Sequence, residues 1–449
     1  MKRIWLVMLS LGLVLAFSAS AMAVDVKFSG EFYAVGMYLD KTSLVTTGTS
    51  ANISTAFYYQ RLRVQTDFIV APGLKLVTRF DAMERIWGGY RSPADGGTTP
   101  PTLATGSAGT REENENIAVD WAYIDYASPI GTFDVGIMND GSTGTIFGNS
   151  YAPAGRIKYS YTTGPVTLNA AYTKVLDKSY SAVTTTSNFT DADNDKYGIE
   201  GVYTWKDGKA GINVNYYRYA EKRPGTGLSY NYEKKYFLFT PYAIAKIGPV
   251  ALQAELNYAT GDYKAYDNGA TNVTLQSISG WIDATATFSP VYFGGTFAYI
   301  QGDDPATTDK YEGALNGGTD WNPCLIMFNQ DLTYWAGAIP GYPATAATSN
   351  TSPMTNAWFG QGRVGVKPVP ALDIMASLSY AQADKKPAGV INAVYGWEID
   401  VTGTYKLTNN LSYMLGGAYF FTGDYYKGNN NANSLNNDFM LINKLTLTF

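Results

Sequence analysis

The chain has 449 residues, no histidine, one cysteine and a formal charge of −5. The lack of histidine excludes a Ser-His-Asp triad, a His-ligated zinc site and an imidazole base. The single cysteine, Cys324, excludes an internal disulfide, and the negative charge gives no reason to expect nucleic-acid binding. Charged residues make up only 16%, and the 36 tyrosines and 46 glycines suit strands and polar loops.

The first residues have the pattern of a secretory signal. Two basic residues precede an apolar run over 4–17, and Ala21 and Ala23 complete an A-x-A cleavage pattern. An N-terminal membrane anchor is the alternative, but the run is too short to span comfortably. We therefore expect cleavage after 1–23 and a single domain over 24–449. No later apolar run approaches the roughly 18 residues that a transmembrane helix needs.

Strict alternation of apolar and polar residues follows along the rest of the chain. The clearest segments are 56–70, 74–83, 250–258, 372–380, 397–405 and 440–449. In the last of them, Leu445, Leu447 and Phe449 share one face. Lys444 lies on the opposite face. A strand with lipid on one side and a water-filled lumen on the other alternates in this way.

Short turns and long polar loops alternate between these segments. Eight turns are rich in Gly, Pro, Asn or Asp. The nine longer segments are 40–54, 86–114, 139–155, 176–195, 221–233, 261–273, 302–355, 382–394 and 422–437. The pattern predicts an all-β protein, a transmembrane antiparallel β-barrel of about 18 strands, with 16 possible. Short periplasmic turns and long extracellular loops are expected.

On these features the chain resembles the outer-membrane porin family. The segments that carry the resemblance are 59–64, 121–125 and the closing 445–449, together with the signal sequence. The chain is most similar to OmpJ-type porins of metal-reducing deltaproteobacteria. The resemblance implies a diffusion channel, commonly a homotrimer, with one loop folded into the pore. It also implies a place in outer-membrane lipid and lipopolysaccharide. Leu445, Leu447 and Phe449 would be the signal for the barrel assembly machinery.

Charged side chains on the predicted lumen face are the candidate pore lining. They are Lys27, Arg61, Arg63, Asp67, Lys75, Arg79, Asp81, Glu200, Glu255, Asp283, Arg363, Glu398, Asp400 and Lys444. The arginines and lysines of 61–79, joined by those at both chain ends, could form a basic wall that attracts anions. Alternatively they only keep water in the pore and pair with Asp67 and Asp81. Because the signs are mixed, we expect weak selectivity and leave its direction open.

Two loops and one motif need separate interpretation. The 139–155 segment is either a constriction loop or an ordinary surface loop. The long 302–355 segment contains an apolar patch that could plug the mouth, bind a partner or, as we favour, pack on neighbouring loops. Cys324 within it is expected to be a small buried residue. The G-x-G-x-x-G sequence at 360–365 lacks a following helix, so it does not indicate a dinucleotide site.

The leading hypothesis is a passive porin of the outer membrane without catalysis, cofactor or metal. A second hypothesis is a structural barrel that sheathes a partner such as a multihaem outer-membrane cytochrome. An outer-membrane enzyme is disfavoured because known lipase and protease barrels use histidine.

Overall fold

The computed structural model describes residues 24–88, 117–178, 192–223, 231–315, 318–344 and 348–449. The predicted signal peptide, with Ala21 and Ala23, lies outside these residues. Strand dominates the described chain, and its helical elements are α2 (Gln330–Ala336) and a short 3-10 helix, η1 (Asp424–Lys427). No helix in the described part of the chain is long and apolar enough to cross a membrane.

Eighteen long strands form one wall. They are β1 (Asp25–Leu39), β2 (Thr55–Ala71), β3 (Leu74–Ile86), β4 (Ala118–Ser128), β5 (Gly131–Asn139), β6 (Pro153–Thr163), β7 (Val166–Leu176), β8 (Asn194–Trp205), β9 (Gly208–Tyr219), β10 (Tyr232–Ile247), β11 (Val250–Tyr266), β12 (Val273–Phe288), β13 (Val291–Ile300), β17 (Ala357–Val369), β18 (Leu372–Gln382), β19 (Val394–Lys406), β20 (Leu411–Thr422) and β21 (Asp438–Thr448). Three two-residue strands, β14 (Lys310–Tyr311), β15 (Ile339–Pro340) and β16 (Ser349–Asn350), lie in the loop between β13 and β17.

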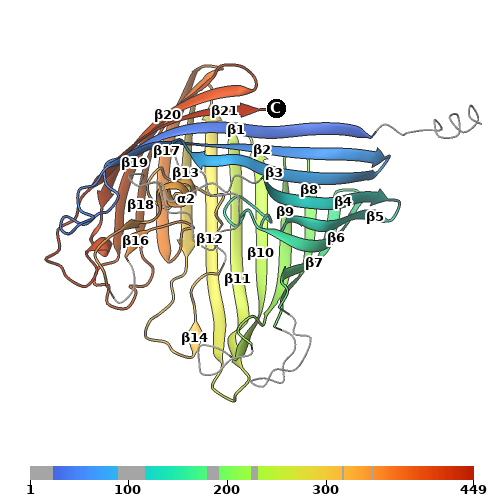
Figure 1. Cartoon of the computed structure of the whole chain (residues 1–449), viewed down its shortest axis with the longest axis horizontal. Helices are drawn as coiled ribbons and strands as arrows, with labels where there is room; N and C mark the ends of the chain where they lie inside the picture. Colours follow the sequence, from blue (N-terminus) through green and yellow to red (C-terminus); the bar gives the residue numbers. More distant parts are fainter. Residues whose placement is uncertain (1–23, 89–116, 179–191, 224–230, 316–317, 345–347) are drawn as a thin grey trace, which may run out of the picture.

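The wall closes on itself. Each long strand pairs antiparallel with the next one along the chain, and β21 pairs with β1 from Glu31↔Thr448 to Leu39↔Met440. Figure 1 shows this closure where the red end of the chain meets the blue one. Beyond the last strand pair, Phe449 N donates to Gly30 O at 3.1 Å. The prediction of an antiparallel barrel with 18 strands is confirmed.

The period-two pattern of the sequence separates an outer from an inner face. In β21, Leu441 is 55% exposed and Leu447 is 38% exposed, whereas Met440 on the other face is 1% exposed. The same alternation recurs in β19, where Trp397 is exposed and Glu398 is buried. Apolar side chains therefore cover the outside of the wall, as contact with lipid requires.

All eight predicted turns and all nine predicted loops connect the long strands in the expected order. One loop is shorter than predicted, because β11 continues to Tyr266 and leaves only 267–272 before β12. The glycine motif at 360–365 lies inside strand β17 of the barrel. As expected from the sequence, it is therefore not a nucleotide-binding loop.

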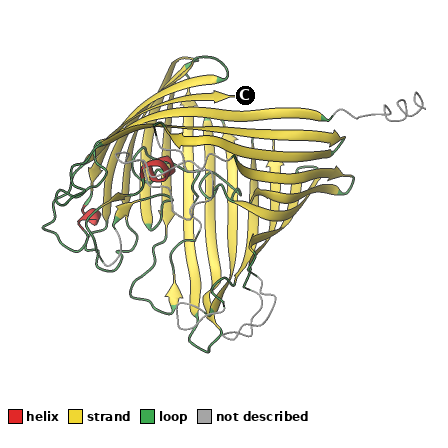
Figure 2. Ribbon diagram, in the orientation of Figure 1, coloured by secondary structure: helices red, strands yellow, loops and turns green. Residues whose placement is uncertain are grey.

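The 301–356 loop is folded into the barrel and also packs on neighbouring loops. Figure 2 shows α2 of this loop within the outline of the strands. The loop contributes Ile326, Met327, Leu332 and Trp335 to the apolar core, and each of them is at most 2% exposed. The same core contains Leu44 and Phe147 of two other loops, as the preferred prediction expected, and the apolar patch also packs against the inner wall.

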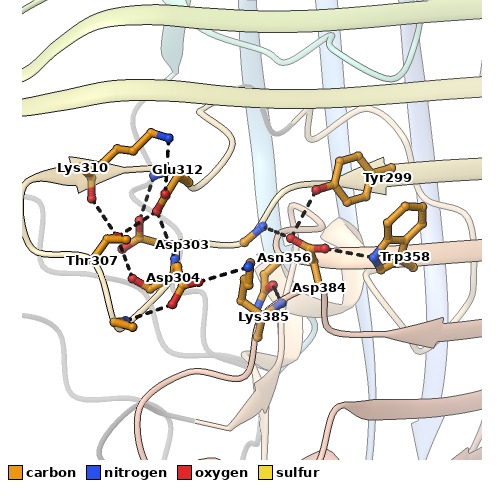
Figure 3. A network of polar contacts seen from close by, with 12 residues as sticks. Tyr299, Asp303, Asp304, Thr307, Lys310, Glu312, Asn356, Trp358, Asp384 and Lys385 are labelled. Atoms are coloured by element: carbon orange, nitrogen blue, oxygen red, sulfur yellow. Dashed lines mark hydrogen bonds and ion pairs between the residues drawn. The ribbon is translucent and has the colours of Figure 1, made fainter.

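Polar contacts fix both ends of the 301–356 loop to the loop that follows β18 (Figure 3). The Asp384 carboxylate accepts hydrogen bonds from Gly302 N and Trp358 Nε1, both at 3.0 Å. Asp304 and Lys385 form an ion pair at 3.1 Å. These contacts hold the base of the inserted loop at the rim of the barrel.

Candidate functional site

Arg61, Arg63, Lys75 and Arg79 of β2 and β3 lie on the inner face, where each lies near a carboxylate. Arg63 donates two parallel hydrogen bonds to Asp81, at 2.7 and 2.6 Å. Lys75 lies 3.5 Å from Asp67 and 3.6 Å from Asp125. Bidentate pairing of this kind fixes the guanidinium in one orientation. The wall is therefore a set of ion pairs, as the alternative reading of the sequence expected, more than a bare basic surface.

Two more cations meet at the seam between the last and first strands. Arg61 and Lys444 both approach the ring of Tyr33, at 4.9 and 4.7 Å from its centroid. Arg61 also lies 3.7 Å from Glu31. Lys444 joins the charges of β2 because β21 closes against β1, as predicted from the sequence.

A β-bulge turns an acidic side chain of β4 toward the lumen. In the β3–β4 ladder, Arg79 pairs with Trp121 and Phe80 with Val119, so Asp120 is an extra residue. It consequently shares the inner face with Trp121. Asp120 accepts a hydrogen bond from Arg79 Nε at 3.1 Å. The Arg79 guanidinium lies 3.6 Å from the centroid of the Trp121 ring.

A second bulge, in β3, turns another acidic side chain, Glu84, toward the lumen. Met83 and Glu84 both lie opposite the single residue Arg61 of β2. Met83 takes φ +54° and is 47% exposed on the outer face. The extra residue reverses the alternation beyond it, so that Glu84 points into the lumen.

The 301–356 loop is attached to the inner wall at two strands. The backbone N–H groups of Ile326 and Met327 donate to the two oxygens of Glu398 on β19, at 2.7 and 2.6 Å. Trp335 of α2 stacks on Tyr59 of β2, with ring centroids 4.3 Å apart. The loop is thus held against the part of the wall where the last strands close on the first.

Glu398 and Asp400, both predicted to line the pore, are covered by this loop. Asp400 is 3% exposed and accepts a hydrogen bond from Ser377 at 3.2 Å. Cys324 is 3% exposed, as expected for a small buried residue. One ligand atom of each of these three residues lies within 4.8 Å of the others, the spacing of a possible metal cluster. Burial, followed by the two nearby carboxylates, raises the pKa of the Cys324 thiol, and we assign no metal to it.

The 140–152 loop also lies inside the barrel. The backbone N–H and the hydroxyl of Thr145 donate to one oxygen of Glu255 on β11, at 2.6 and 2.8 Å. Gly144 takes φ +81°, and a Cβ at this position would lie 2.4 Å from the same carboxylate. Only glycine allows this close approach. Glu255, 4% exposed, therefore holds a loop and does not face open lumen.

The two inserted loops meet through aromatic rings. Phe147 stacks on Trp281 of β12, with centroids 5.9 Å apart, and contacts Trp321 of the longer loop at 5.5 Å. Together they fill part of the lumen and leave an opening along β2, β3 and β4.

This opening is a cavity of about 710 Å³. Its lining comprises Tyr33, Arg61, Arg63, Asp81, Glu84, Ala118, Asp120, Tyr151, Thr319, Asp320, Asn322, Gln330, Asp331, Tyr334 and Trp335. Of the predicted pore-lining residues, Arg61, Arg63 and Asp81 are among them. Burial raises the pKa of Asp320, and the charge of Arg63 opposes the shift.

The remaining predicted residues lie elsewhere on the strands. Lys27 is opposite Asp67 in the β1–β2 ladder. Asp283 on β12 pairs with Arg363 on β17, across the intervening strand β13, at 2.7 Å. Glu200 accepts hydrogen bonds from Asn169 at 2.7 Å and Tyr242 at 2.9 Å. These groups brace the wall outside the cavity.

Sequence reasoning missed Glu84, Asp120, Tyr151 and the acidic residues of the long loop. The bulges break the alternation on which the prediction depended, and nothing in the sequence marks where a bulge falls. For Asp320 and Asp331, the only signal was the length of their loop. That length suggested a functional role but did not show that the loop lines the cavity.

Comparisons with known proteins identify the architecture. No protein-family profile matches the sequence, and a search of curated proteins finds no match. Among solved structures, the chain is similar to Pseudomonas aeruginosa OccK2 (OpdF) in complex with glucuronate, at 12% identity and a TM-score of 0.50, over 95% of this chain and 97% of that one. It is equally similar to Pseudomonas aeruginosa OpdK with vanillate, at 12% identity and a TM-score of 0.50, over 94% and 98% of the two chains. At this identity the likeness concerns the fold.

Proposed function

We propose that the protein is an outer-membrane porin, a water-filled channel for passive diffusion of small polar solutes and ions. The observation that carries the proposal is a closed wall with an apolar outside and a charged cavity of about 710 Å³ inside. Such a wall is stable only with lipid outside and water within. The fold shared with solved outer-membrane channels supports the same conclusion.

Two competing functions have less support. Sheathing a cytochrome would need a wide lumen, and the 140–152 and 301–356 loops occupy much of the space in this one. Catalysis lacks a histidine in the whole sequence, and the similar structures are those of channels. We therefore favour a non-enzymatic role.

Several finer points belong to the proposal. They are the cleavage of 1–23, recognition of Leu445, Leu447 and Phe449 by the assembly machinery, homotrimer formation, contact with lipopolysaccharide, and the closer likeness to OmpJ-type porins. Their support is the sequence pattern and, for Phe449, its place at the end of the closing strand. A cytochrome partner would have to bind outside the lumen cavity.

Planar-bilayer recording of the purified protein tests the proposal. We expect stepwise, ohmic conductance increments on adding protein to the bilayer, and permeability to small sugars in a liposome-swelling assay. A correctly folded barrel that gives no conductance and no swelling would refute a diffusion channel. Folding is checked by β-rich circular dichroism and by the heat-dependent mobility of the barrel in detergent gels.

A further inference from the structure

Carboxylates outnumber basic groups around the lumen cavity. Two arginines, Arg61 and Arg63, face five acidic residues, Asp81, Glu84, Asp120, Asp320 and Asp331, which leaves the lining with a formal charge of −3. Three further charges contact the lining, namely Arg79, Lys444 and Glu31, and they change this value only to −2. Among the described residues the net charge is therefore negative with either set.

Each arginine beside the cavity lies close to a neighbouring carboxylate. The guanidinium of Arg63 is held by both oxygens of Asp81, and that of Arg79 by Asp120. Arg61 lies against Glu31 and the ring of Tyr33. A paired charge presents little net field to a passing solute, because its partner cancels most of it.

Three carboxylates have no such compensation. Within the described residues, Glu84, Asp320 and Asp331 form no ion pair with a lysine or arginine, although all three line the cavity. Glu84 comes from the wall, through the bulge at Met83, and the other two come from the inserted loop. The uncompensated charge thus faces the opening from both sides.

We propose that this cavity is a cation-preferring filter, which favours small cationic solutes, including protonated amines, over anions of the same size. The inference rests on the proposed channel function. It specifies the sign of the ion selectivity, which the mixed charges of the sequence left open. The electrostatic reason is that three fixed negative charges attract cations and repel anions inside a low-dielectric wall. Tyr33, Tyr151 and Trp335 add aromatic surface, to which cations are also attracted.

Reversal potentials in a KCl gradient test the proposal. At low salt, where the Debye length is about 10 Å or more, we expect K⁺ to be preferred over Cl⁻ by roughly threefold or more. The triple variant Glu84→Gln, Asp320→Asn, Asp331→Asn should bring this ratio close to unity. Asp207→Asn, the same charge change in the β8–β9 turn far from the cavity, should leave the ratio unchanged.

A second arm uses organic probes. In liposome swelling, n-butylammonium should permeate faster than propionate, which has the same number of non-hydrogen atoms, and the triple variant should lose this difference. A channel that conducts but prefers Cl⁻, or whose ratio does not respond to the triple variant, would overturn the filter while leaving the channel function intact. Absence of any conductance in folded wild-type protein would instead overturn the channel function itself. If the triple variant fails to fold, the single variant Asp320→Asn must lower the ratio by itself.

Discussion

The hydrogen bonds between Thr145 and Glu255 predict that one carboxylate keeps the 140–152 loop inside the barrel. Glu255 is 4% exposed and receives two hydrogen bonds from this loop, at 2.6 and 2.8 Å. A hydrogen bond to a charged acceptor contributes about 1.5–3 kcal/mol. Glu255→Ala should therefore weaken docking of the loop by roughly 3–6 kcal/mol, a change of about two to four orders of magnitude in its docking equilibrium.

Single-channel recording provides the assay. We expect Glu255→Ala to raise the mean conductance and to add slow current fluctuations as the loop leaves and re-enters the lumen. Glu200→Ala is the matched control, since Glu200 accepts hydrogen bonds from Asn169 and Tyr242 of the wall and holds no loop residue. Unchanged conductance and noise in Glu255→Ala, or an equal change in Glu200→Ala, would show that this anchor does not position the loop.

Three further predictions concern the long loop and the cavity. Trp335→Ala should weaken the packing of α2 on Tyr59 by about 3–5 kcal/mol and make the 301–356 loop accessible to chymotrypsin, which intact protein should resist. Because burial raises the pKa of Asp320, its carboxylate should take up a proton at a higher pH than an ordinary aspartate. Cation preference, measured by reversal potentials, should then decline as the pH is lowered, and the decline should be smaller in Asp320→Asn. The raised pKa and burial of Cys324 predict no reaction with a maleimide at pH 8 until the barrel is denatured.

The wall could be predicted from the sequence because lipid imposes a simple rule on it. Alternation from 56–70 to 440–449, with turns at regular intervals, was enough to give 18 strands and their order. The closure of the last strand on the first followed as well, and it brings Lys444 and Arg61 to the same ring, that of Tyr33. Each of these features depends on local patterning that repeats along the chain.

The contents of the lumen depend on contacts between residues far apart in the sequence, for which no local rule exists. Glu255 and Glu398 looked like pore-lining charges, because they alternate with apolar residues as lumen side chains do. Their actual partners, Thr145 and the 326–327 backbone, lie 110 and about 70 residues away in the chain. A carboxylate that faces the lumen can bind a passing ion or an inserted loop, and the sequence of its own strand is the same in both cases.

The sign of the cavity charge depends on the two bulges. Strict alternation would turn Glu84 and Asp120 toward lipid, where a carboxylate is costly. One extra residue in each ladder, at Met83 and at Asp120, brings both carboxylates inside. Each bulge thus places one carboxylate in the lumen instead of in lipid. Because Met83 is the extra residue, deleting it should leave Glu84 on the inner face and Ile86 opposite Tyr59, and should change the yield of folded barrel little. Deleting Thr78, in a regular part of the same strand, should turn the residues on one side of it to the opposite face and lower the yield. An equal loss of folded barrel from the two deletions would mean that Met83 is not the residue that absorbs the change of face.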